Sequence, residues 1–163
     1  MLTLSVSALR DRLHTCLAVE RWADEVAAGA PYVDASALVD AARRAATPLA
    51  RAEVDEALAG HPRIGQAPTG TGAEQQFSRR EQASADAYDT ELAALLAAGN
   101  RDYEARFGRV FLIRAAGRTR AEILAELNRR ILLPGDLEAE IVADELRDIA
   151  LLRLAALLEA GAV

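Results

Sequence analysis

Two groups of residues in the chain have the types and spacing of an acid–base site. The first is His61, at the start of the segment HPRIG (residues 61–65), because histidine is the side chain that most readily exchanges a proton near neutral pH. The second is Ser78, Glu81 and Gln82, which would share one face of a helix because residues three and four apart are neighbours there. A carboxylate beside a histidine raises the pKa of the imidazole and orients its ring. We predict that Glu81 serves His61 in this way where the fold brings the two together.

Both groups also have a structural interpretation. A histidine that follows a helix is often a cap, and a polar helix face is often simply solvated. The other histidine, His14, lies on a helix near Arg10 and Leu17, and the one cysteine, Cys16, lies on an apolar stripe. We expect both of these residues to be structural.

The composition excludes several kinds of chemistry and of partner. All 19 basic residues are arginine, so no lysine can form a Schiff base or serve a Walker-type phosphate loop. One cysteine and two separated histidines make no cluster of transition-metal ligands, whereas a carboxylate site for Mg²⁺ or Ca²⁺ stays open. The net charge is −6 and no purely basic block occurs, so nucleic acid is not an expected partner. The first residues lack the layout of a signal peptide, and no apolar run reaches the length of a membrane span. We expect a cytoplasmic protein with no membrane partner.

The elements that must position these residues are helices. Of the 163 residues 52% are apolar, alanine is common, and aromatic residues are 4%, which favours packed helices over a β-sandwich. We predict an all-α single domain over residues 1–163, with roughly eight helices and one short extended segment at 110–113. A loop rich in proline and glycine (61–72) carries the HPRIG segment. The helices are expected at about 5–19, 20–28, 34–46, 47–59, 73–98, 101–107, after Thr119, and 137–158.

Three motifs in this order resemble the family of OHCU decarboxylases, and the resemblance covers nearly the whole chain. They are HPRIG at 61–65, Ser78-x-x-Glu81-Gln82, and Tyr103-x-x-x-Phe107-Gly108-x-x-Phe111-Leu112-Ile113. The substrate of that family is 2-oxo-4-hydroxy-4-carboxy-5-ureidoimidazoline, abbreviated OHCU, and the product is (S)-allantoin, formed in the last step from urate.

The resemblance implies an all-α enzyme that needs no cofactor or metal and is commonly a homodimer. The catalytic histidine of the family matches His61. Its substrate-binding residues match Pro62, the stretch from Ser78 to Gln82, and Phe111, Leu112, Ile113, Arg114 and Ala115. Arg114 stands where the family often has cysteine, and Ala30 stands where it has an arginine before a proline. Two alternatives therefore remain: a helical binding or scaffold module without activity, and a lyase or hydrolase acting on a related ureido compound.

Overall fold

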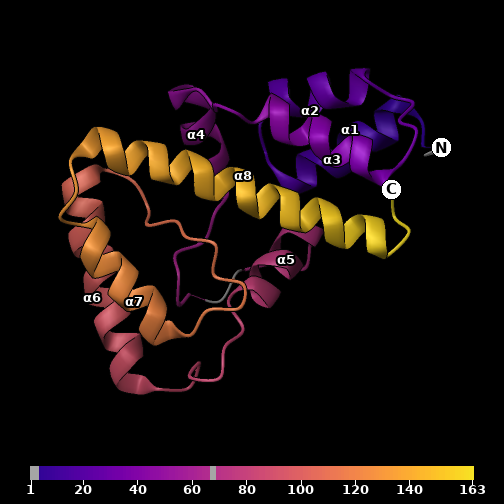
Figure 1. Ribbon diagram of the computed structural model, residues 1–163. Coiled ribbons are helices and arrows are strands. Elements are labelled where there is room, and N and C mark those ends of the chain that lie inside the picture. The colour runs from indigo at the N-terminus through magenta and orange to yellow at the C-terminus, as the bar shows by residue number, and fades with distance from the viewer. Residues whose placement is uncertain (1–3, 67–68) are drawn as a thin grey trace. The chain divides into compact units, whose positions relative to one another are not determined.

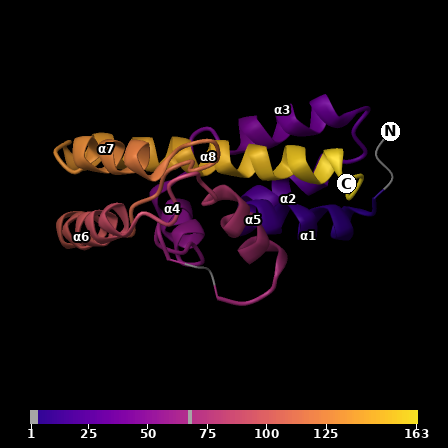
Figure 2. The ribbon, with the colours of Figure 1, turned by 90° about the horizontal axis from the view of Figure 1, so that it is seen from below.

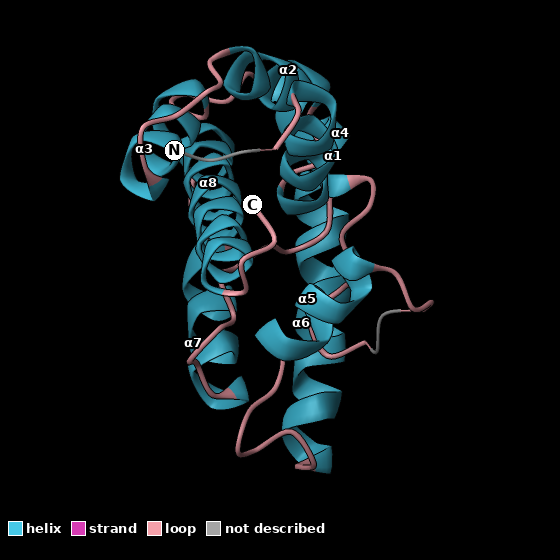
Figure 3. Ribbon diagram, turned by 90° about the vertical axis from the view of Figure 1, so that its right-hand side faces the viewer, coloured by secondary structure: helices cyan, strands magenta, loops and turns pink. Residues whose placement is uncertain are grey.

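The computed structural model describes residues 4–66 and 69–163, and within them the chain forms eight helices and no strand (Figures 1 and 3). The all-α prediction is confirmed. No helix among these residues is long and apolar enough to cross a membrane. Chain contacts divide the molecule into two compact units. One contains the residues up to Gly60 together with Ala143–Val163, and the other contains His61–Val142.

The first unit is a helical bundle built on small and apolar side chains. It contains α1 (Val6–Cys16), α2 (Glu20–Ala28), α3 (Ala35–Ala45), α4 (Arg51–Leu58) and the later part of α8 (Gly135–Glu159). The side chains of Ser5 and Asp34 cap α1 and α3, as their positions predict. Trp22 is fully buried in α2, and its indole N–H donates to the carbonyl of Ala42 at 2.9 Å, so its polar atom is satisfied in the core.

The second unit contains every residue predicted to do chemistry. It is formed by α5 (Ala73–Glu81), α6 (Thr90–Phe107), α7 (Arg120–Arg130) and the beginning of α8. Helices α6 and α7 lie side by side (Figures 1 and 2). In the sequence between these two helices, residues 109–115 belong to no helix. The predicted extended segment is therefore present, and it does not pair as a strand. The core of this unit consists of Ile64, Leu96, Tyr103, Phe111, Ile113, Ala115, Ile123 and Leu127.

The predicted helix over 73–98 and the predicted break at Gly99-Asn100 are both wrong. Two helices occupy this stretch. Helix α5 ends at Glu81, and α6 begins at Thr90 because the Asp89 side chain accepts the backbone N–H of Leu92. Helix α6 then continues through Gly99 to Phe107. Gly99 is an interior packing position, because a Cβ atom there would lie 2.8 Å from a methyl carbon of Leu127.

The prediction that Thr47-Pro48 starts a helix is also wrong. The hydroxyl of Thr47 donates to the carbonyl of Arg43 at 2.7 Å, so this residue completes the end of α3. The next helix begins at Arg51, where the Glu53 carboxylate accepts the backbone N–H of Ala50.

Candidate active site

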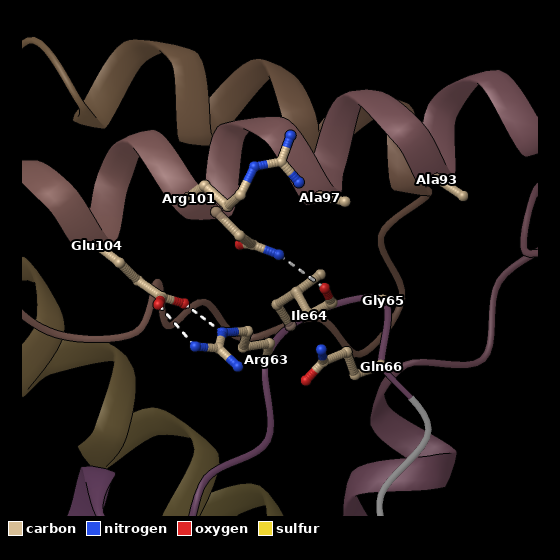
Figure 4. A pocket seen from close by; sticks show the side chains of 9 residues that line it. Arg63, Ile64, Gly65, Gln66, Ala93, Ala97, Arg101 and Glu104 are labelled. Carbon is tan, nitrogen blue, oxygen red and sulfur yellow. Dashed lines mark hydrogen bonds and ion pairs between the residues drawn. The ribbon is translucent and has the colours of Figure 1, made fainter.

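The HPRIG segment is fastened to α6 at two consecutive residues. The Arg63 guanidinium forms an ion pair with Glu104 through two nitrogen atoms, and this contact holds the pKa of the Glu104 carboxyl below its usual range (Figure 4). The carbonyl of Ile64 accepts a hydrogen bond from Asn100 Nδ2 at 2.9 Å, and the Ile64 side chain packs into the core. The path of the backbone just after His61 is therefore fixed by the helix beneath it.

Gly65 joins this segment to the second predicted motif. Its backbone N–H donates to Gln82 Oε1 at 2.9 Å, and its φ of +86° is a conformation that favours glycine. Gln82 is the residue that ends α5, and Glu81 is the last residue within it. The C-terminal end of α5 consequently lies against the HPRIG segment. The bond uses the Oε1 atom of Gln82 and does not consume the two donors on Nε2.

The other residues of these two motifs are partly or fully shielded from water. His61 and Pro62 are half-buried, and the Nε2 atom of His61 is buried. Ser78 is 3% exposed, whereas Glu81 and Gln82 are half-buried. The structure thus brings together the segments that carry His61 and Glu81. That these two side chains form an acid–base pair stays a prediction.

The apolar side chains of the segment Phe111–Ala115 are buried, which leaves its backbone N–H groups as candidate donors to a ligand. Phe111, Leu112, Ile113 and Ala115 are each at most 4% exposed, and Arg114 is half-buried. Within residues 4–66 and 69–163, the backbone N–H groups of Phe111, Leu112 and Ile113 donate no hydrogen bond. Substrate binding by these four apolar residues would therefore have to use main-chain donors, as an extended stretch in a helical protein can.

A buried ion pair lies under the segment. Arg130 and Glu138 are both completely buried, and they are joined through Arg130 Nε and Nη2. The Tyr103 hydroxyl donates to the same carboxylate, and burial first, then this contact, raises the pKa of Tyr103 to about 12. Arg130 Nη1 donates to the carbonyl of Leu112 at 2.8 Å. The two charges thus connect α7 and the start of α8 to the extended segment.

Sequence reasoning assigned no site role to Asn100, Glu104, Arg130 or Glu138. Asn100 was missed because the Gly-Asn pair is typical of a helix end. Arg130 did carry a signal: it continues the buried stripe of Ile123 and Leu127 at helical spacing, where a charged residue is unusual.

A cavity of about 270 Å³ lies between the HPRIG segment and α6 (Figure 4). Its polar lining includes the Arg63–Glu104 pair and the exposed Arg101. His61 and Glu81 are not among its lining residues, so it is not the predicted acid–base centre. The complete lining is Arg63, Ile64, Gly65, Gln66, Ala93, Ala97, Asn100, Arg101 and Glu104.

Among the described residues, no three histidine, cysteine or acidic side chains gather as metal ligands do.

The family model that describes OHCU decarboxylases matches residues 3–155. The chain belongs to the OHCU decarboxylase family. A crystal structure of an OHCU decarboxylase in the presence of (S)-allantoin is similar over 91% of this chain and 98% of that one, with a TM-score of 0.75 and 27% identity. A crystal structure of an (S)-allantoin synthase, at 17% identity, shares the fold over 95% of this chain and 51% of that one, with a TM-score of 0.67.

One curated relative of this family member is the uric acid degradation bifunctional protein TTL of Arabidopsis thaliana. It is 41% identical over 107 residues, which are 63% of this chain. The match spans 32% of the plant protein, so this chain corresponds to about a third of its length. The resemblance inferred from the three motifs is confirmed at the level of the family.

Proposed function

We propose that this chain decarboxylates OHCU to (S)-allantoin and CO₂ in urate degradation, and that residues 1–163 act as one catalytic domain without a cofactor. The observation that carries the proposal is the Gly65–Gln82 hydrogen bond, because it holds the two motifs that carry the predicted acid–base residues against each other. The match of the family model to residues 3–155 and the similarity to an OHCU decarboxylase solved with (S)-allantoin support it.

The reaction needs a place for electrons and a proton. When the C–C bond to the carboxylate breaks, CO₂ leaves and the electron pair stays on the ring carbon. The chain has no lysine, so it cannot form a Schiff base that would take up this pair. The C=N and oxygen groups of the substrate ring can accept it instead. The protein then supplies orientation, electrostatic stabilisation of the ring oxygens and one proton.

The proposed roles follow the chemistry of each group. His61 delivers the proton to the ring carbon, and Glu81 orients the imidazole and favours its charged form. Pro62 restricts the backbone conformation of His61. Backbone N–H groups of Phe111, Leu112, Ile113, Arg114 and Ala115 hold the ring oxygens. Ser78 and the Nε2 donors of Gln82 hold the ureido group or the ring, and Arg114 pairs with a substrate carboxylate or with a second subunit.

The partners proposed are few. The ligand is the ureidoimidazoline itself, and neither nucleic acid nor a membrane takes part. The excess of acidic residues, 25 against 19 arginines, supports the absence of a nucleic-acid partner. We further propose a homodimer that works in the cytoplasm, as the resemblance to the family implies.

The test generates OHCU in situ from urate and follows (S)-allantoin by circular dichroism. The wild-type chain should accelerate product formation and give the S enantiomer in excess, because the bound ring presents one face to the donor. His61→Asn should lower the rate roughly 10²–10⁴-fold, which is the usual contribution of a positioned acid or base. His14→Asn is the matched control, since His14 lies in α1 and contacts Glu20 at 3.0 Å.

Three outcomes would contradict the proposal. A folded wild-type chain that does not accelerate the reaction would favour a binding module, or an enzyme for a related ureido compound. Near-normal turnover by a folded His61→Asn variant would remove the histidine from the chemistry. Racemic product from an accelerated reaction would show that the proton comes from solvent.

A further inference from the structure

The buried pair Arg130–Glu138 is an unusual feature of a small helical unit. Both side chains are 0% exposed, and removing two charges from water costs free energy that an apolar pair would not. Stability therefore gives no reason for an ion pair here. The contacts of Arg130 indicate a different purpose, because its remaining nitrogen, Nη1, holds the carbonyl of Leu112 in the extended segment at 2.8 Å.

That hydrogen bond fixes the direction of a neighbouring donor. The peptide unit between Leu112 and Ile113 is planar and trans, so its C=O and its N–H point in opposite directions. Because Arg130 holds the Leu112 carbonyl on the side of the buried pair, the N–H of Ile113 points to the opposite side. Within the described residues this N–H donates no hydrogen bond.

The surrounding contacts prevent the guanidinium from turning. Glu138 receives Nε and Nη2 of Arg130, and Tyr103 donates to the same carboxylate. The guanidinium also lies over the ring of Phe111, 4.7 Å from its centroid, so it touches two consecutive residues of the segment. A neutral side chain of similar length would fill the space without fixing the peptide.

We propose that Arg130 is a positioning residue that orients the Leu112–Ile113 peptide, so that the N–H of Ile113 is presented to an oxygen of the bound ureidoimidazoline. Glu138 and Tyr103 set the orientation of Arg130. This inference rests on the proposed function for its substrate, but the orientation of the peptide is independent of turnover. The hydrogen bond from the Ile113 N–H stabilises the bound molecule most when negative charge develops on the ring oxygen during loss of CO₂.

The test compares two double variants, each of which removes one ion pair that involves α7. Arg130→Met with Glu138→Gln removes the buried pair without leaving a lone charge in the core. Arg129→Met with Glu126→Gln removes a partly exposed pair from α7 and is the matched control. Thermal unfolding and the stoichiometry of (S)-allantoin binding first establish that each protein is folded and fully competent. The buried double variant should then show kcat lowered roughly 10²-fold with KM nearly unchanged, because a donor to developing charge acts in the transition state. The control should match the wild type.

A second measurement starts from the wild-type protein and does not depend on turnover. In ¹⁵N-labelled protein, (S)-allantoin should shift the Ile113 amide resonance, and the buried double variant should lose that response. An unshifted Ile113 amide in the wild type would overturn the inference, and so would a folded double variant with normal kcat. If (S)-allantoin shifts this amide in the wild type and not in the buried double variant, but the wild type does not accelerate decarboxylation, the proposed function fails while the positioning role of Arg130 stands.

Discussion

Replacing Asn100 by aspartate places a carboxyl group where an amide now donates to the carbonyl of Ile64. Asn100 is 5% exposed, and the hydrogen bond is 2.9 Å long. An ionised carboxylate cannot donate, so two acceptors would face each other in the core. Burial and this contact must raise the pKa of the introduced carboxyl above its ordinary value of about 3.9. With a folded-state pKa of about 6, the free energy of unfolding at pH 7 would fall by about 3 kcal/mol from this cause.

The sign of the pH dependence follows from that rise in pKa. Below about pH 4 the introduced carboxyl is protonated in both the folded and the unfolded chain, and in the protonated form it can donate to Ile64. As the pH rises through the folded-state pKa, stability relative to the wild type is lost, and the loss is complete above it. Thermal unfolding from pH 4 to pH 8 measures this directly. A loss of about 3 kcal/mol corresponds to a decrease of roughly 6–12 °C in Tm for a chain of this size.

Asn128→Asp is the matched control, because Asn128 is an exposed residue of α7. It should change Tm little at any pH. The loss of the bond to Ile64 should also displace His61, which begins the HPRIG segment. Decarboxylation by the Asn100→Asp variant should therefore fall at pH 7 and recover partly in acid, relative to the wild type. A difference in Tm that is zero, or that does not depend on pH, would refute the assignment of Asn100 as a donor that holds Ile64 in place.

Three further predictions concern the same unit. Glu81→Gln should lower the rate and displace the pH–rate profile, and an unchanged profile would make Glu81 a structural residue. Gly99→Ala should lower the unfolding free energy by a net ~1 kcal/mol, since crowding against Leu127 outweighs the gain in helix propensity, and an unchanged or raised Tm would contradict this. The lowered pKa of Glu104 gives stability that is present above its ordinary pKa of 4.5 and is lost as the pH falls through the folded-state value. Glu104→Gln should remove that pH dependence from urea unfolding curves, and an unaltered dependence would count against the pair with Arg63.

The sequence by itself determined the helical class, several helix starts and the family. Helix caps are local: Ser5, Asp34 and Thr119 each accept a backbone N–H within three residues, so their positions are readable without a fold. The motifs at 61–65 and 78–82 are also contiguous, and their residue types alone indicate acid–base chemistry. The extended segment at 110–113 was predictable because β-branched and aromatic residues follow a glycine there.

Tertiary structure decided everything that depends on partners distant in the chain. The passage of α6 through Gly99 brings this residue against Leu127 of α7, a contact that no local propensity encodes. Asn100 has the residue type of a helix end, yet it becomes the donor that holds Ile64, which lies 36 positions earlier in the chain. Arg130 has the residue type of a surface group, yet the fold surrounds it with Glu138, Tyr103 and the carbonyl of Leu112. The physical reason is that burial and hydrogen bonding are properties of the packed chain, whereas sequence patterns report mainly on neighbours within a few residues.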